Sequence, residues 1–219
     1  MLEPYKRVTN AIVGLVNRAE GGNTRAVAAL ASKQVQNAFL QAAQRCARSG
    51  FVLGTLSEAS LRLTRSRYLT LAGGTSLTEA GVEDIAILEL KGGAALNGVT
   101  PPLHPEIHNL VYSRTEYDAL FLCQPAYAMF WLTSGRALDF SILPALEQRV
   151  GRISICQQPD LEGALPASDL VLIIGQGVLS LGHSLDEALD RVEALEGICR
   201  QNQLAGSAGI ERPSNGQAE

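Results

Sequence analysis

The sequence predicts an α/β protein in which helices cover a sheet of short strands. Apolar residues recur at helical spacing near the start, in the middle and at the end of the chain, and short strand-like runs lie between them. The 219 residues are 46% hydrophobic and 18% charged, which is typical of one soluble domain. The apolar runs are far shorter than the ~20 residues that a membrane helix needs.

The first part of the chain predicts two helices. Residues 4–19 carry apolar side chains at steps of three and four, and a Gly-Gly pair then ends the pattern. This stripe consists of Val8, Ile12, Leu15 and Val16. A second stripe covers residues 35–46, and Gly50 follows where a left-handed residue commonly ends a helix.

The next part of the chain changes from helical to strand periodicity. Residues 61–64 alternate between apolar and polar side chains, and residues 68–71 and 85–90 are also strand-like. Gly73 and Gly74 form a turn signal between the last two runs. We therefore expect several short strands here.

The second half of the chain alternates helices and buried strands. A loop rich in Gly, Asn and Pro covers residues 92–102, and a helix is expected from His104 because proline, which follows it, is favoured at the first helical position. Ser184 and Glu187 form a capping box at the start of the last helix. The chain is polar from residue 201 onward. Buried strands are expected at 119–123, 153–156 and 170–174.

Charge and cysteine usage limit the classes of partner and site. The net charge of −4 offers no basic surface for nucleic acid or for an anionic membrane. The four cysteines lie singly in apolar stretches without a C-x-x-C pair, so we expect free thiols in a reducing cytoplasm. A three-histidine metal site would need every histidine of the chain, which are His104, His108 and His183.

Three segments resemble, in this order and spacing, the class II aldolase/adducin family. They are GFVLGTLSEASLRL at 50–63, PPLHPEIHNLVYSRTEYDALFLCQPAYA at 101–128 and VLIIGQGVLSLGHSLDEALDRVEALE at 171–196. The resemblance implies a three-layer α/β/α domain with a central, mostly antiparallel sheet over residues 35–200. We expect an extra helical extension at 1–34 before it and a flexible polar tail at 201–219 after it.

The residues that carry the chemistry of this family differ here. Family members hold a zinc ion on three histidines, beside a glutamate that acts as acid and base. By the resemblance, Leu122, Gln124 and Gln176 stand at the zinc-ligand positions, and His104 stands at the glutamate position. Zinc binds imidazole, thiolate or carboxylate groups, which leucine and neutral amides do not supply. We therefore expect no zinc at these positions and no cofactor.

The phosphate-binding segments of the family are kept only in part. Gly54 and Ser57 match the turn that cradles the substrate phosphate, but Thr55 replaces its asparagine. The second phosphate loop has lost both of its hydroxyl residues and contains Gly73 and Gly74. This pair is either a plain β-turn or a source of backbone N–H groups for an anion.

The remaining polar candidates each allow two interpretations. His104 and His108 are four residues apart, the spacing that places two side chains on one side of a helix, so they form either a hydrogen-bonded structural pair or a relocated divalent-metal site. Gln124 and Gln176 either satisfy each other's amides or bind a ligand directly. Cys123 would become a nucleophile only if one of the histidines lowered its pKa.

Two classes of function remain open at this point. The first is a lyase or isomerase for small hydroxylated or sugar-phosphate compounds, with a non-standard metal site or a metal-free proton-transfer site around His104. The second is a non-catalytic protein that, like the adducin head, binds a ligand or builds an assembly. In both cases the resemblance implies a homo-oligomer, with a tetramer favoured, and a small-molecule ligand; we expect neither a nucleic-acid nor a membrane partner.

Overall fold

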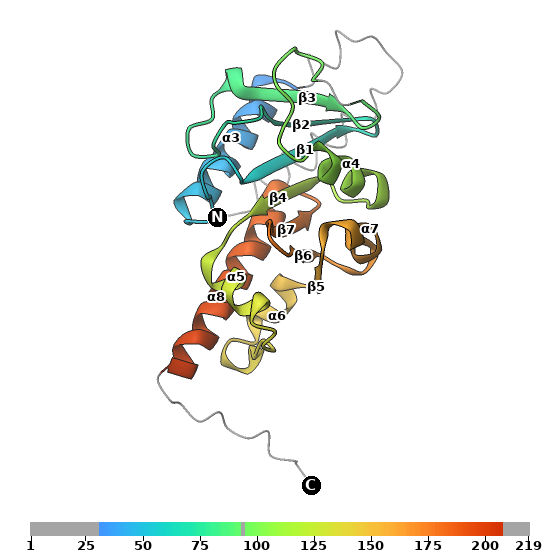
Figure 1. Ribbon diagram of the computed structural model, residues 1–219. Coiled ribbons are helices and arrows are strands. Elements are labelled where there is room, and N and C mark those ends of the chain that lie inside the picture. The colour runs from blue at the N-terminus through green and yellow to red at the C-terminus, as the bar shows by residue number, and fades with distance from the viewer. Residues whose placement is uncertain (1–30, 93–94, 208–219) are drawn as a thin grey trace.

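The computed structural model describes residues 31–92 and 95–207, and the helix expected at 4–19 lies outside this part (Figure 1). One seven-stranded sheet forms the centre, with the strand order β3-β2-β1-β4-β7-β6-β5. All neighbouring strands are antiparallel except β5 and β6. The strands are β1 (Glu58–Thr64), β2 (Arg67–Leu71), β3 (Ile85–Glu89), β4 (Ala119–Cys123), β5 (Ile153–Cys156), β6 (Leu170–Ile173) and β7 (Gly177–Gly182).

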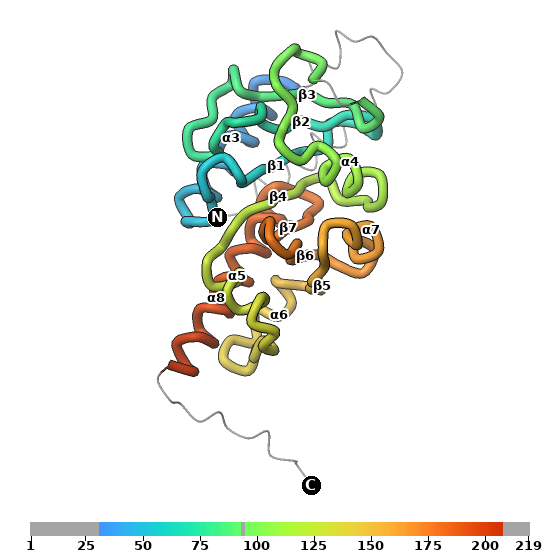
Figure 2. The backbone as a smooth tube through the Cα atoms, in the orientation of Figure 1, coloured from blue at the N-terminus to red at the C-terminus, as the bar shows by residue number. Residues whose placement is uncertain are grey.

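Helices cover both faces of this sheet, as the tube in Figure 2 shows. The first core cluster lies between one face and α3, α5 and α8, and the second lies between the other face and α4 and α7. The predicted three-layer α/β/α fold with a mostly antiparallel sheet is therefore confirmed. The helices are α3 (Lys33–Arg48), α4 (Pro105–Arg114), α5 (Ala126–Thr133), α6 (Ala145–Val150), α7 (Leu161–Ala164) and α8 (Leu185–Ser207). Short 3₁₀ turns are η1 (Val82–Asp84), η2 (Phe140–Ile142), η3 (Gln158–Asp160) and η4 (Leu165–Ala167).

Strand β1 divides its side chains between the two faces. Successive residues of a strand point to opposite sides, so Ala59, Leu61 and Leu63 enter the core beneath α3 and α8. Glu58 and Ser60 face the other way and meet α4. This alternation places a carboxylate and a hydroxyl group in the layer that otherwise holds the second core.

The ends of the helices follow the local sequence closely. Helix α3 ends before Gly50, which has a φ of 79° as its position predicts. Helix α4 begins at Pro105, as expected, but the side chain of His104 makes no capping hydrogen bond. At the start of α8, the Ser184 hydroxyl accepts from the Glu187 N–H at 3.1 Å, and the Glu187 carboxylate accepts from the N–H of residue 183 at 2.9 Å.

The end of α8 corrects the expectation of a polar tail from residue 201. The helix continues to Ser207, and Asn202 is fully buried within it. The Asn202 amide accepts from the Asp139 N–H at 2.9 Å and donates to the Asp139 carbonyl at 3.0 Å. These long-range bonds hold a polar stretch in helical form. In the described part of the chain, no helix is both long and apolar enough to span a membrane.

Candidate functional site

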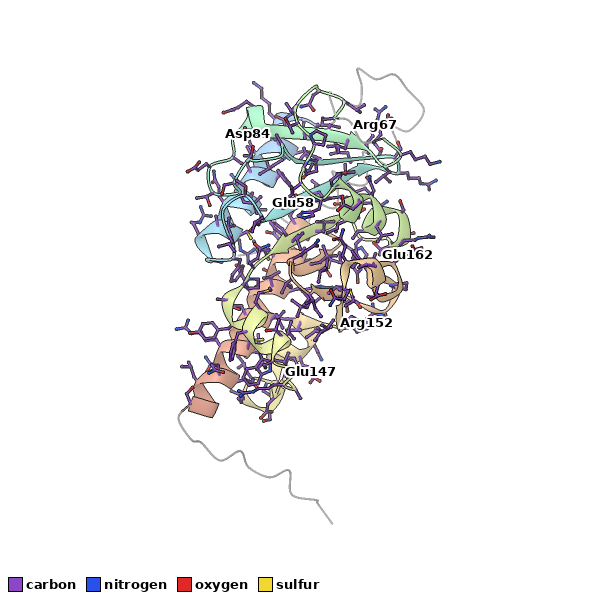
Figure 3. The ribbon with its side chains drawn as sticks, in the orientation of Figure 1. Glu58, Arg67, Asp84, Glu147, Arg152 and Glu162 are labelled. Carbon is purple, nitrogen blue, oxygen red and sulfur yellow. The ribbon has the colours of Figure 1, made fainter. Side chains whose placement is uncertain are left out.

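The predicted site residues come together at one end of the central strands. The segment before β1 contributes Gly54 and Ser57, and the turn after β2 contributes Gly73 and Gly74. The start of α4 contributes His104 and His108. Gln124 follows β4, and Gln176 lies in the turn between β6 and β7. They form an amide cluster around Gln124 and a carboxylate–histidine cluster around Glu58. Figure 3 labels Glu58, which lies centrally where β1 approaches β4 and α4.

Every polar atom of the Gln124 side chain has a partner. Its oxygen accepts a hydrogen bond from the Ser57 hydroxyl at 2.6 Å, and its nitrogen donates to the carbonyls of Gln176 at 3.1 Å and Leu56 at 3.4 Å. The two carbonyls can only accept, so they determine which end of the amide is the nitrogen. The Ser57 oxygen also accepts from the Leu53 N–H at 3.0 Å. The amide therefore holds together three chain segments.

The Gln176 side chain turns away from Gln124. Its nitrogen donates to the Gln158 oxygen at 2.6 Å, and the Gln158 nitrogen donates to the Glu106 carboxylate at 3.2 Å. The Glu106 carboxylate can only accept, so the Gln158 nitrogen faces it and the Gln158 oxygen faces the Gln176 nitrogen. The buried Gln176 oxygen is left without a hydrogen-bond partner. The interpretation that the two glutamine amides satisfy each other is wrong in detail: Gln124 bonds the backbone of Gln176.

These groups do not fit a zinc ion. Leu122 is 1% exposed and belongs to the second core cluster, where it pairs with Glu58 across the sheet. The side-chain amides of Gln124 and Gln176 are neutral and already take part in hydrogen bonds. Zinc prefers imidazole, thiolate or carboxylate ligands. Over residues 31–92 and 95–207, no group of three or more His, Cys, Asp or Glu residues is arranged to hold a metal ion.

Glu58 connects the two predicted histidines, because the ring nitrogens of His108 bond Ser60 and Glu58 and do not bond His104. One carboxylate oxygen lies 2.8 Å from His108 Nε2, and the other accepts the His104 backbone N–H at 3.0 Å. The His104 Nδ1 atom lies 3.4 Å from the latter oxygen and forms no hydrogen bond. The side chains are 7% exposed for Glu58, 0% for His108 and 20% for His104. Only His104 thus reaches solvent appreciably.

A directed hydrogen-bond chain leads to the Glu58 carboxylate. The Tyr112 hydroxyl lies 2.7 Å from the Ser60 hydroxyl, which lies 2.8 Å from His108 Nδ1. All groups are satisfied when Tyr112 donates to Ser60, Ser60 donates to Nδ1, and His108 Nε2–H donates to Glu58. The His108 ring also stacks on Tyr68, with the ring centroids 5.6 Å apart. The chain therefore directs a hydrogen bond from His108 onto the Glu58 carboxylate.

The electrostatics of Glu58 favour its ionised form. Burial alone would raise the pKa of Glu58, but the hydrogen bond from His108 and the contacts with both histidines outweigh it, so the pKa lies below its ordinary value. Burial also raises the pKa of Tyr112, which keeps its proton. Sequence reasoning missed Glu58. The only signal was an acidic residue at the start of an alternating strand, which more often marks a solvated face.

A small cleft adjoins Glu58. It is lined by Thr55, Ser57, Glu58, residues 70–75, Pro102 and Leu103, and its cavity volume is about 10 Å³. Gly73 lies so close to the neighbouring loop that a Cβ atom would stand 2.3 Å from the Pro101 carbonyl oxygen. Gly74 has a φ of 85°, which favours glycine. Both glycines are therefore explained by the shape of the turn.

Cys123 and His183 take no part in this site. Cys123 is buried, and a hydrogen bond with Cys46 together with burial raises the pKa of its thiol, so neither histidine activates it. All four cysteines are free, as predicted. His183 is exposed, and its ring lies tilted against the Tyr117 ring, with the centroids 4.9 Å apart.

Comparison with known protein families identifies the family of this chain. Residues 37–203 match the family described as the Class II Aldolase and Adducin N-terminal domain. The chain belongs to this family. No curated protein sequence matches it.

Solved structures show the same fold at low identity. YgbL from Klebsiella pneumoniae is 22% identical, with a TM-score of 0.67, and the match covers 80% of this chain and 90% of YgbL. L-Fuculose-1-phosphate aldolase from Thermus thermophilus is 20% identical, with a TM-score of 0.66 over 82% of this chain and 97% of the aldolase. A sugar-phosphate aldolase from Thermotoga maritima is 19% identical, with a TM-score of 0.69 over 82% and 98%. These structures confirm the predicted fold, and the family match over residues 37–203 confirms the resemblance seen in the sequence.

Proposed function

We propose that this class II aldolase-family protein does not perform zinc-dependent aldol chemistry, and that it binds a small hydroxylated compound in a metal-free site. The observation that carries this proposal is that both polar atoms of the Gln124 side chain already have hydrogen-bond partners, Ser57 and the Gln176 carbonyl. The resemblance places a zinc ligand at this position. A zinc ion there would have to displace these bonds and would gain only neutral oxygen ligands in return.

The loss of zinc would also remove the main stabilisation of an enediolate. A bound metal ion stabilises developing oxygen charge by several kcal/mol, and no group of comparable charge replaces it among the described residues near Gln124. The proton-active groups that remain are Glu58 and His104, whose Nδ1 atom lies 3.4 Å from the carboxylate. His104 lies beside this carboxylate and is 20% exposed, so its ring is the proton-active group that a ligand reaches most easily. This arrangement favours binding or non-standard proton transfer over aldol cleavage.

Zinc binding tests the proposal directly. We expect the purified wild-type chain to take up no stoichiometric zinc at micromolar concentrations, measured by competition with a chromophoric chelator. The triple variant Leu122→His, Gln124→His and Gln176→His should gain zinc affinity if these positions still converge. The alanine variant at the same three positions is the control. About one tightly held zinc per wild-type chain, lost in the Gln124→Ala and Gln176→Ala variants, would overturn the proposal.

We also propose a homo-oligomer, with a tetramer favoured, as the resemblance implies. The described surface carries large apolar side chains that support association, including Phe130 on α5 and Leu204 on α8, which are 52% and 50% exposed. Light scattering on the full chain and on a chain that lacks the first 22 residues tests this. A monodisperse 23.3 kDa species at micromolar concentration would contradict the oligomer.

A further inference from the structure

The cleft beside Glu58 carries a single charge. Among the described residues that line it, Glu58 is the only ionisable side chain apart from hydroxyl groups, and no Lys, Arg or His contributes. The donor chain from Tyr112 through Ser60 and His108 ends on the Glu58 carboxylate and stabilises its ionised form. A ligand in the cleft therefore meets a carboxylate, and no cationic side chain of the lining faces it.

The turn after β2 offers little to an anion. Its N–H groups at Ala72, Gly73 and Thr75 donate to carbonyls of Asp84 at 2.7 Å, Thr100 at 3.1 Å and Ala72 at 3.1 Å, respectively. Backbone N–H groups bind a phosphate only when several of them point at it together. Three donors of this turn are already used within the protein.

Two hydroxyl groups of the cleft donate hydrogen bonds within the protein, and two do not. Ser57 donates to Gln124 and Thr70 donates to the Ala59 carbonyl at 2.8 Å. The hydroxyl groups of Thr55 and Thr75 make no hydrogen bond within the described part of the chain. These two groups can donate to, and accept from, an uncharged polar ligand.

The enclosed part of the cleft is also small. Its volume of about 10 Å³ is close to the minimum that holds one water molecule. It therefore fits one hydroxyl or carbonyl oxygen of a ligand whose remainder lies in the open mouth.

From these contacts we propose that the cleft selects an uncharged hydroxylated compound and that Glu58 excludes phosphorylated ones. The inference rests on the proposed function, because it names the ligand class of the same site. Glu58 is the specificity-determining residue: its charge repels a phosphate, and its carboxylate accepts a hydrogen bond from a hydroxyl group of a neutral ligand. The free Thr55 and Thr75 hydroxyls complete the recognition.

Titrations followed by NMR on the full chain test the selectivity. Dihydroxyacetone should shift the backbone amide signals of Gly74 and Thr75, and dihydroxyacetone phosphate and inorganic phosphate should bind at least tenfold more weakly. Glu58→Gln keeps the shape of the side chain and removes its charge. In this variant the preference for dihydroxyacetone over the two phosphate compounds should fall by at least tenfold. Glu147→Gln, on the distant helix α6, is the matched control and should leave the preference unchanged.

A second variant keeps the test decisive if Glu58→Gln does not fold. Thr75→Lys adds a positive charge at a partly exposed position in the cleft and should raise phosphate affinity at least tenfold. The inference is wrong if phosphate compounds bind wild type as tightly as dihydroxyacetone, if no compound perturbs the cleft, or if folded Glu58→Gln and Thr75→Lys both leave the preference unchanged. Failure of the proposed function is a separate result, because it is read from zinc stoichiometry on the wild-type chain.

Discussion

Replacing His108 by leucine tests whether Glu58 is a buried anion that depends on its histidine partner. His108 is fully buried, and its two ring nitrogens lie 2.8 Å from Glu58 and 2.8 Å from Ser60. Leucine fills a similar space but offers no hydrogen bond. The variant therefore leaves a buried carboxylate oxygen and a buried hydroxyl group without their partner.

The expected loss of stability in His108→Leu follows from these two groups. Removing one member of a buried ionic or hydrogen-bonded pair costs about 3–5 kcal/mol, because the other member stays buried without compensation. Little screening by solvent applies, since the Glu58 side chain is only 7% exposed. Against a total stability of about 5–15 kcal/mol, a loss of this size is readily measured. The replacement of exposed His183 by leucine is the control, and its change should stay below about 1.5 kcal/mol because it loses only the ring contact with Tyr117.

Urea unfolding followed by circular dichroism gives the free energies of wild type, His108→Leu, Glu58→Gln and the double variant. The double variant should be at least about 1.5 kcal/mol more stable than the sum of the single effects predicts, because the second substitution removes the stranded charge. A loss below about 1 kcal/mol in His108→Leu, or strictly additive losses, would refute the reasoning.

The pH dependence of stability gives a second measurement on the same variants. Because the folded pKa of Glu58 is lowered, its contribution is fully present above the unfolded glutamate value of about 4.3 and is lost as pH falls through the folded pKa. Wild type should therefore lose stability below about pH 4.3 more steeply than Glu58→Gln, which has no carboxylate to protonate at this position. Parallel curves for the two proteins would contradict a lowered pKa.

Three further predictions concern the turn, the last helix and the thiols. Gly73→Ala should lower the free energy of unfolding by about 1–3 kcal/mol, because its Cβ would stand 2.3 Å from a backbone oxygen. The control is Gly163→Ala, at an exposed position of α7 with nothing within 4 Å, and it should cost nothing measurable. Asn202→Ala should cost about 1–3 kcal/mol by calorimetry, whereas a residue in a flexible tail would cost nothing measurable. In native protein at pH 7, partly exposed Cys156 should react first with a maleimide, ahead of buried Cys199, whose pKa burial raises to about 12. Equal labelling rates for these two thiols would count against the packing of α8.

The local sequence determined most of the secondary structure. The strands at 119–123 and 153–156 were predicted with their observed bounds, because short apolar runs mark strands. The expected burial is confirmed for 119–123 and is wrong for 153–156, because β5 is the edge strand and Ile155 is 48% exposed. Pro105 and the Ser184 cap predicted the starts of two helices, since both act within a single turn. Neither β7 nor α5 was separately predicted. The family resemblance depended on residue identities at fixed spacing, and the sheet topology agrees with it.

Only the tertiary structure decided what the site residues contact. Glu58 and His108 are fifty residues apart, and they meet because β1 turns its even-numbered side chains toward α4. The spacing of His104 and His108 predicted a pair, but it could not reveal the carboxylate between them. Helix α8 likewise extends past residue 200 because Asn202 bonds a distant backbone segment. Sequence periodicity reports which face of an element is apolar; it does not report which polar groups the packing of separate elements brings within hydrogen-bond distance.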